Sequence, residues 1–319
     1  MSDNDHNLVI GRIDLLAKGV RRLTLTHPDG AELPAWTPGS HIDLHFSFGG
    51  MDFTRQYSLC GHTDDSRHWQ VAVLHVPDGR GGSAYIHDNL CEGGTLRVAG
   101  PRNNFPLAPA SNYLFVAGGI GITPMLPMIA EAEAKGADWR LIYCGRSADT
   151  MAFLDDVSGF GADRVVIQPS DTHGRVDLAD LIAHADPATH IYCCGPESML
   201  DAIEGGCADW PSTQVHMERF SKREDDLHQS SNPFEVEFAR SGIAATVPAD
   251  RSILEIAEEA GIDVESSCQE GVCGSCETAV LAGTPDHRDE VLTDDERAAC
   301  KTMMICVSRA CSGRLVLDV

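Results

Sequence analysis

Four cysteines near the carboxyl end have a spacing that could bind iron. The set, written C-x4-C-x2-C-x29-C, consists of Cys268, Cys273, Cys276 and Cys306. Four thiolates can hold a two-iron, two-sulfur (2Fe-2S) cluster, and three closely spaced cysteines with a distant fourth suit it. Because the cluster and its thiolates are anionic, they need backbone N–H donors close by. Gly271 and Gly274 allow the loop to wrap tightly enough to provide them.

Structural zinc is the main alternative, because zinc also takes four thiolates. Zinc sites usually combine two C-x2-C motifs, whereas Cys306 has no partner two residues away. Cys300 and Cys311 lie at the wrong distance from Cys306 to complete such a motif, and we expect neither to be a ligand. The spacing therefore favours the 2Fe-2S cluster. The last segment of the chain resembles a plant-type ferredoxin domain over its whole length.

A glycine-rich turn in the middle of the chain is a candidate nucleotide site. The segment 118–124, GGIGITP, follows an apolar run and precedes a stretch with helical periodicity. Glycines there let a pyrophosphate approach the N–H groups at the amino end of a helix. Thr123 could cap that helix, with Pro124 as its first residue. The candidate residues are Gly118, Gly119, Gly121 and Thr123. A plain tight turn would explain the glycines alone.

A second motif lies at the end of another apolar strand. It reads CGPESM over residues 194–199, and its candidate cofactor residues are Cys194, Gly195 and Pro196. In a parallel sheet both motifs would face one crevice at the carboxyl ends of the strands. The pair of motifs resembles the pyridine-nucleotide half of the ferredoxin–NADP reductase superfamily. That resemblance places Cys194 beside the nicotinamide.

Two segments upstream could bind a flavin. Arg55, Tyr57 and Ser58 match the superfamily's R-x-Y-S flavin signature, which offers an arginine for a phosphate, a ring against the flavin and a hydroxyl near its reactive nitrogen. The segment GRGGS at 79–83 then opens a helix and presents N–H groups to an anion. Its candidate residues are Arg80, Gly81, Gly82 and Ser83. The signature alone would also fit an ordinary strand.

The order of these motifs covers essentially the whole chain and resembles reductase components of the phthalate dioxygenase and vanillate demethylase type. The resemblance implies that the GRGGS segment binds the phosphate of FMN. NADH would give a hydride to FMN, and electrons would pass singly to the 2Fe-2S cluster and on to a terminal, Rieske-type oxygenase. We expect no catalytic nucleophile or acid–base pair, because the cofactors carry the chemistry. The alternatives are FAD as the flavin, a haem-thiolate monooxygenase as the acceptor, and a carrier with a degenerate nucleotide domain.

Single residues carry weaker hypotheses. Phe220 stands where the family has an aromatic residue near the flavin, although a hydrophobic plug at a domain edge fits equally. Asp171 predicts a preference for NADH, because a carboxylate repels the 2′-phosphate of NADPH and binds a free 2′-hydroxyl, unless it is merely a turn residue. His41, Asp43 and His45 share one face of a strand, and we interpret that face as solvent-exposed rather than as a metal site.

The periodicity of the sequence predicts the elements that position these residues. Short alternating runs at 20–26, 41–46, 54–59, 69–75 and 95–98 indicate an antiparallel β-barrel, with a helix at 83–90. From residue 112 strands alternate with helices, which indicates a doubly wound parallel sheet. We therefore predict a multidomain α/β and β protein. Its parts are an FMN-binding barrel (1–108), an NAD-binding domain (109–220), a polar linker (221–232) and a ferredoxin domain of the β-grasp type (233–319).

The composition limits the choice of partners. The 319 residues include 48 Asp and Glu against 24 Lys and Arg, a net charge of −24, and the segment from 233 onward carries 7 − 17 = −10. Such a charge disfavours nucleic acids and anionic membranes and suits a basic protein surface, although solubility alone would explain it. The amino terminus lacks the apolar region of a signal peptide, and no run approaches the ~18 apolar residues of a membrane span. We expect a cytoplasmic monomer.

Overall fold

The computed structural model describes residues 5–79, 81–221 and 232–319. The chain forms two compact units, Met1–Glu218 and Arg219–Val319. Two predictions concern residues outside the described ranges: Arg80 at the flavin site, and most of the polar linker, 222–231.

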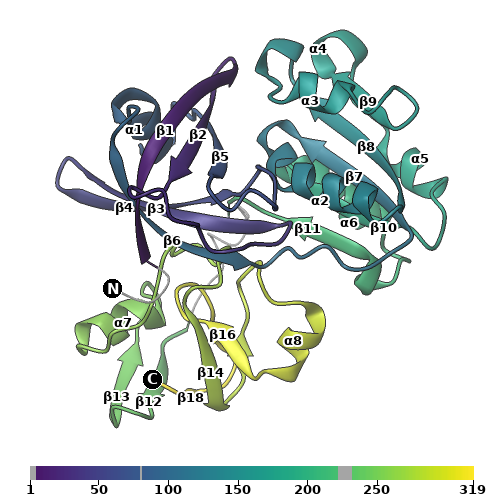
Figure 1. The fold of residues 1–319 in the computed structure, drawn as a ribbon. Coiled ribbons are helices and arrows are strands. Elements are labelled where there is room, and N and C mark those ends of the chain that lie inside the picture. The colour runs from purple at the N-terminus through teal and green to yellow at the C-terminus, as the bar shows by residue number, and fades with distance from the viewer. Residues whose placement is uncertain (1–4, 80, 222–231) are drawn as a thin grey trace. The chain divides into compact units, whose positions relative to one another are not determined.

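The first part of the amino-terminal unit is a six-stranded antiparallel sheet in the order β4-β3-β6-β1-β2-β5 (Figure 1). Its strands are β1 (Asp5–Ala17), β2 (Val20–Thr26), β3 (Ser40–Phe48), β4 (Met51–Ser58), β5 (Trp69–Leu74) and β6 (Thr95–Asn103), with helix α1 (Gly82–Asn89) between β5 and β6. An antiparallel bridge between Leu59 and Val71 joins the two edges at one end and curls the sheet towards a barrel. Ile42, Leu44 and Trp69 lie in its fully buried core.

The second part of the same unit is a five-stranded parallel sheet in the order β11-β10-β7-β8-β9. Its strands are β7 (Asn112–Gly118), β8 (Asp138–Gly145), β9 (Val165–Pro169), β10 (His190–Cys194) and β11 (Val215–Glu218). The α-helices are α2 (Ile122–Ala134), α3 (Leu154–Ser158), α4 (Ser170–His173), α5 (Leu178–Ala183) and α6 (Glu197–Gly206), and short 3₁₀ helices span Gly119–Gly121, Ala148–Thr150 and Ser212–Gln214.

Helices cover both faces of this parallel sheet. Residues of α2 pack against Phe115 and Tyr143 on one face, while those of α5 and α6 pack against Val116 and Ile142 on the other (Figure 1). The strand order reverses between β7 and β10, which is where doubly wound sheets bind ligands. The predicted doubly wound sheet is confirmed.

The carboxyl-terminal unit is built on a mixed five-stranded sheet in the order β13-β12-β18-β14-β16. Its elements are β12 (Phe234–Phe238), β13 (Ile243–Val247), α7 (Ile253–Glu259), β14 (Glu277–Ala282), β15 (Pro285–Asp286), α8 (Asp294–Ala299), β16 (Thr302–Met304), β17 (Arg309–Ala310) and β18 (Arg314–Leu317). β12 and β18 pair in parallel, and the other pairs are antiparallel. A capping box from Ser252 and Glu255 starts α7, whose Ile253 and Ala257 are fully buried in the core of this unit.

The interpretation of one barrel face as solvent-exposed is wrong. Asp43 is 2% and His41 5% exposed. An Arg102 nitrogen on β6 donates to both carboxylate oxygens of Asp43, at 2.8 and 2.7 Å, and Gln56 donates to the same group at 3.1 Å. Burial and the nearby Arg102 lower the pKa of His41 to about 4, so that imidazole is neutral at neutral pH. The charge on this face is therefore neutralised by an arginine from the neighbouring strand, and the alternating pattern of β3 does not reveal that.

Candidate functional site

A cavity of about 790 Å³ lies at the carboxyl ends of the parallel strands. Its lining comes from the turn after β7, the loops after β8 and β9, and the start of α6. The lining includes Gly118, Gly119, Arg146, Ser170, Arg175, Asp177 and Pro196. The cavity therefore occupies the edge of the sheet at which the two predicted nucleotide motifs end.

The two motifs contact each other backbone to backbone. A Cβ atom on Gly121 would lie 2.1 Å from the carbonyl oxygen of Cys194, and one on Gly118 would lie 2.5 Å from the Pro196 ring. Only glycine fits either position. Gly121 also precedes α2, whose first turn has no side-chain cap, so the positive end of the helix dipole faces this contact without a neutralising side chain.

Thr123 does not have the capping role expected from the sequence. Helix α2 begins at Ile122, so Thr123 lies inside it, and its buried hydroxyl donates to the Ile120 carbonyl at 3.0 Å. The 3₁₀ turn of Gly119–Gly121 runs directly into the helix and starts it earlier than the expected first residue, Pro124. The Thr123 hydroxyl thus stabilises the turn.

The predicted flavin residues assemble an anion site at the start of α1. A Cβ on Gly82 would lie 2.7 Å from Arg55 Nε, so the guanidinium of Arg55 lies directly against the first residue of the helix. Gly81 precedes it with a φ of 84° and provides no side-chain cap. The Ser83 hydroxyl accepts from the Val76 N–H at 3.1 Å, which leaves its own proton to donate. A cation, a hydroxyl and uncapped N–H groups are a suitable donor set for a phosphate.

A buried polar junction joins the barrel to the parallel sheet. Ser58, at the end of β4, is buried and hydrogen-bonded to the Glu218 carboxyl at the end of β11. Glu218 pairs in register with Cys194 on β10. Burial raises the pKa of Glu218 to about 8, with the Ser58 bond acting in the opposite direction, and burial together with Glu218 raises the pKa of the Cys194 thiol. The predicted flavin and nicotinamide residues therefore meet at this carboxyl group.

Glu218 itself was missed by sequence reasoning. Within the described part of the chain its Oε2 atom is buried without a hydrogen-bond partner, which leaves a hydrogen-bonding position for a polar group of a bound cofactor. The sequence offered one signal, an acidic residue just before Phe220.

Tyr57, the predicted flavin-stacking residue, packs against the barrel core, and burial raises the pKa of its hydroxyl.

Two of the weaker candidates are not among the residues that line the cavity. Phe220 follows β11 and is 46% exposed. Asp171 lies on α4 and is exposed, and it is absent from the lining of the cavity, although Ser170 and Gly174 on either side belong to it. Its backbone N–H donates to the Arg146 carbonyl at 3.0 Å.

The four predicted cluster cysteines lie together as two pairs. All four are buried, and side-chain hydrogen bonds link Cys268 with Cys273 and Cys276 with Cys306. The loop directs donors at the sulfurs: the Glu270 N–H lies 3.3 Å from Cys268 Sγ, and the Cys268 N–H lies 3.4 Å from Cys273 Sγ. The side-chain hydrogen bond with Cys268 foremost, together with bonds from Ser275 and from the Cys268 N–H, lowers the pKa of Cys273 to about 6.

This donor set fits a 2Fe-2S cluster, in which each iron takes two thiolates. Gly271 and Gly274, with φ of 76° and 75°, provide the left-handed backbone that the loop requires. Cys300 is half-buried and its thiol donates to the Arg297 carbonyl, while Cys311 is exposed.

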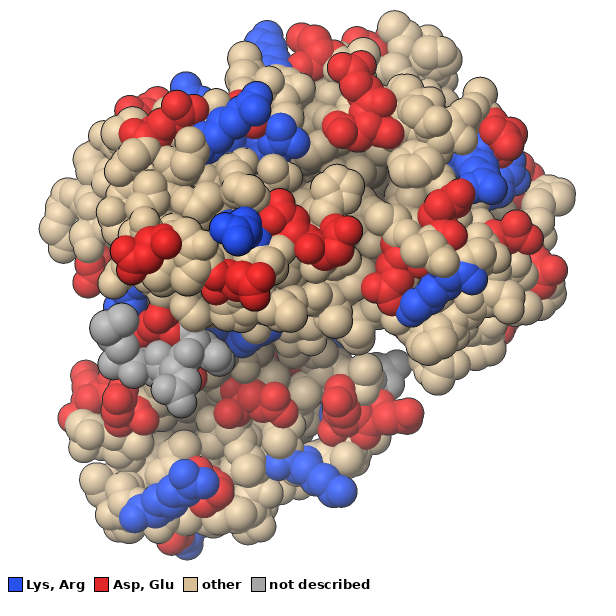
Figure 2. Space-filling model, in the orientation of Figure 1, with Lys and Arg blue, Asp and Glu red and all other residues tan. Residues whose placement is uncertain are grey.

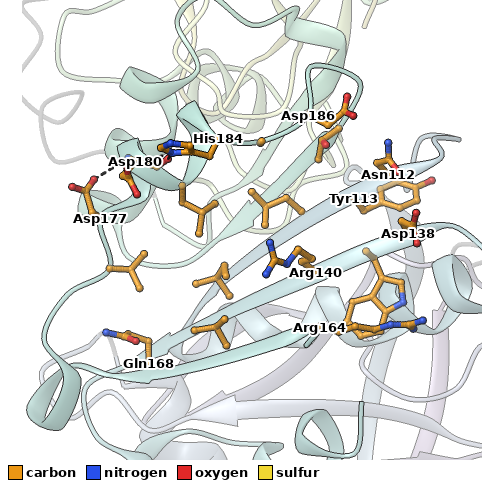
Figure 3. Close-up of a pocket in the computed structure, with 18 of the residues that line it drawn as sticks. Asn112, Tyr113, Asp138, Arg140, Arg164, Gln168, Asp177, Asp180, His184 and Asp186 are labelled. Carbon is orange, nitrogen blue, oxygen red and sulfur yellow. Dashed lines mark hydrogen bonds and ion pairs between the residues drawn. The ribbon is translucent and has the colours of Figure 1, made fainter. Parts of the chain in front are cut away.

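A second hollow, of about 1140 Å³, lies on one face of the parallel sheet. Figure 3 shows Arg140 extending into it from β8, with Asp177, Asp180 and His184 on the α5 side. No sequence motif predicted this hollow. It adjoins the nucleotide cavity, because Gln168 and Arg175 line both.

Comparison with known families assigns each part of the chain. Residues 8–106 match the oxidoreductase FAD-binding domain, 115–205 the oxidoreductase NAD-binding domain, and 236–311 the 2Fe-2S iron-sulfur cluster binding domain. The carnitine monooxygenase reductase subunit of Escherichia coli (strain K12) is 40% identical over 97% of both chains. Phthalate dioxygenase reductase of Burkholderia cepacia is 38% identical over 98% of this chain and 97% of its own.

The chain belongs to the phthalate dioxygenase reductase family. A solved structure of phthalate dioxygenase reductase superimposes with a TM-score of 0.71 at 38% identity, covering 99% of this chain and 98% of that one. An intact type IV self-sufficient cytochrome P450 monooxygenase gives a TM-score of 0.91 at 44% identity, and this chain spans 41% of its length. The reductase is thus an oxidoreductase with flavin, NAD and 2Fe-2S domains, of the kind that supplies electrons to oxygenases. Within the described ranges, no helix is long and apolar enough to cross a membrane.

Proposed function

We propose that the reductase carries electrons from NADH through FMN and a 2Fe-2S cluster to a Rieske-type oxygenase. When bound, the flavin accepts an electron pair and releases it in single steps, and the cluster carries single electrons. The contact between Ser58 and Glu218, next to Cys194, is the observation that carries the proposal. It joins the barrel strand of the flavin signature to the strands of the nicotinamide motif.

FMN is proposed because the anion site at α1 suits one terminal phosphate. Arg55, Ser83 and the uncapped start of α1 provide its donors, and Arg80 is proposed as a further one from the sequence. The matching family description names FAD, so the flavin needs a direct test. Acid release followed by chromatography should yield FMN, and recovery of FAD would contradict this assignment.

Cys268 with Cys273, and Cys276 with Cys306, are proposed as the two ligand pairs of the cluster. Their burial, their pairing and the N–H donors of the loop support this set. The chain would position the flavin and the cluster in separate units, 1–218 and 219–319. NADH-driven reduction of cytochrome c, a one-electron protein acceptor, tests the complete path, and ferricyanide tests the flavin half alone.

An acidic surface on the ferredoxin unit is proposed to dock on a basic oxygenase surface. The segment from 233 onward carries 17 acidic and 7 basic residues. Asp and Glu side chains are spread over the face shown in Figure 2. Such complementarity accelerates association and weakens with salt. The rate of oxygenase reduction should fall as ionic strength rises, whereas reduction of ferricyanide should not follow it.

A haem-thiolate monooxygenase is the second candidate acceptor. The similarity to the type IV P450 chain, at 44% identity, favours it. Reduction assays with a Rieske oxygenase and a P450 as separate acceptors would distinguish the two.

We also propose a cytoplasmic monomer. None of the twelve cysteines, all of which the structure describes, forms a disulfide, as is typical of a reducing compartment. A dimeric mass in sedimentation equilibrium would contradict the monomer.

A further inference from the structure

The nucleotide cavity is more positively charged than its motifs predicted. Arg146, in the loop after β8, and Arg175, in the loop before α5, both line it. Within the described chain, neither guanidinium forms a hydrogen bond or an ion pair. The same holds for Arg140 in the adjoining hollow.

The other described arginines all contact a carboxylate or a carbonyl oxygen. In a chain of net charge −24, two unpaired cations on one cavity indicate an anionic ligand.

Local hydrogen bonds hold both arginines at the same end of the cavity. The backbone N–H of Asp171 and the hydroxyl of Ser170 donate to the Arg146 carbonyl, at 3.0 and 3.4 Å. Gln168 donates to the His173 and Gly174 carbonyls at 3.1 and 3.2 Å, which fixes the backbone just before Arg175. The loops after β8 and β9 are therefore tied together.

This end of the cavity lies away from the nicotinamide motif. In the sheet order β10-β7-β8-β9, Cys194 ends β10, and the phosphate-binding turn follows β7 in the middle. A dinucleotide with its nicotinamide at Cys194 and its pyrophosphate at the start of α2 extends its adenosine ribose over the ends of β8 and β9. Arg146 and Arg175 stand at that position.

Carboxylates do not cancel this charge. Asp177 is the single acidic residue among the lining residues described, and its Oδ1 atom accepts from the Asp180 N–H at 3.0 Å as the cap of α5. Asp171, from which the sequence predicted repulsion of a 2′-phosphate, does not line the cavity.

We propose that Arg146 and Arg175 form a subsite for the 2′-phosphate of NADPH, so that the reductase accepts NADPH as well as NADH. The proposal rests on the function proposed for the cavity, namely dinucleotide binding. It replaces the NADH preference that the sequence predicted from Asp171. Arginine is the side chain best suited to a phosphate dianion, because its planar donors bind two oxygens at once.

Calorimetric titration of the full-length protein tests the subsite with two half-nucleotides, 2′,5′-ADP and 5′-AMP. The wild type should bind 2′,5′-ADP at least about tenfold more tightly. Arg146→Ala and Arg175→Ala should each weaken 2′,5′-ADP on the order of tenfold and 5′-AMP by less than about twofold. Arg140→Ala is the matched control, since Arg140 is also exposed and unpaired among the described residues but lies in the neighbouring hollow. It should change the affinity for neither half-nucleotide.

The ratio of kcat/KM for NADPH to that for NADH, with ferricyanide as acceptor, should fall in both cavity variants and stay unchanged in Asp171→Asn. Equal affinity of the wild type for the two half-nucleotides would overturn the inference, and so would a raised NADPH ratio in Asp171→Asn. In either case continued NADH turnover would leave the proposed function standing. Failure of NADH to reduce ferricyanide at all would instead reject the proposed function.

Discussion

Substitution of Gly121 by alanine should separate the two nucleotide motifs. The new Cβ would lie 2.1 Å from the Cys194 carbonyl oxygen, 2.5 Å from its carbon and 3.0 Å from the Gly195 nitrogen. Ordinary contact begins at 3.4 Å, so the two backbones must move apart by about 3.4 − 2.1 = 1.3 Å. All three atoms belong to the backbone, and no side-chain rotation can relieve the overlap.

The displacement falls on the geometry that aligns the nicotinamide. Cys194 is paired with Ala117 in the ladder between β7 and β10, so a shift of its carbonyl moves the thiol and the neighbouring Glu218. A misplacement of about 1 Å can cost on the order of 10²-fold in rate. Overpacking of this kind costs about 1–3 kcal/mol of stability. We expect kcat/KM for NADH to fall about 10²-fold while the flavin and the cluster stay bound.

Steady-state reduction of ferricyanide, visible spectroscopy and thermal unfolding measure these quantities. Gly136→Ala is the matched control. Unlike Gly121, that glycine has a positive φ, of 70°, and no atom lies within 4 Å of its Cβ position, so its substitution destabilises without any overlap. It should lose about 1–2 kcal/mol to backbone strain and retain wild-type turnover of NADH. Wild-type kcat/KM in Gly121→Ala would refute the contact between the motifs.

Three further predictions concern the flavin, the buried carboxyl and the cluster. Arg55→Ala should weaken flavin binding by on the order of tenfold in a fluorescence titration of the apoprotein. The control Arg67→Ala, on the same barrel, should bind flavin as tightly as the wild type. Equal flavin affinities of Arg55→Ala and the wild type would contradict the phosphate site. Because the pKa of Glu218 is raised to about 8 from 4.5, its contribution to stability is complete below pH 4.5 and is lost as pH rises through 8. The melting temperature of the wild type should fall over that range more steeply than that of Glu218→Gln, and parallel curves would argue against a buried carboxyl. Cys306→Ser should keep NADH-dependent ferricyanide reduction but lose the cluster absorption and most cytochrome c reduction. The control Cys311→Ser should keep all three at wild-type levels. A normal cluster spectrum in Cys306→Ser would point to Cys300 or Cys311 as the fourth ligand.

The sequence predicted most of what depends on contiguous segments. The cluster loop, the flavin signature and the glycine turns are each only a few residues long, and their order along the chain predicts the three domains. The strand Val20–Thr26 has the predicted bounds, because it is a compact run rich in β-branched residues that ends before a turn.

The features that were missed depend on contacts between distant segments. β1 is a central strand of 13 residues with polar residues throughout, so its pattern does not alternate clearly. β11 has four half-buried residues, and the role of Glu218 follows only from its register beside Cys194. Arg146 and Arg175 are 29 positions apart (175 − 146), and the loops that unite them are visible only in the fold.

Anaerobic mixing with NADH tests the central claim most directly, when followed by rapid-scan absorbance and by electron paramagnetic resonance of frozen samples. Flavin absorbance should bleach first, and the paramagnetic signal of a reduced 2Fe-2S cluster should then appear at up to one electron per chain. A flavin that is reduced while the cluster of the same chain stays oxidised would contradict an electron path from the nicotinamide cavity through the flavin to the four cysteines.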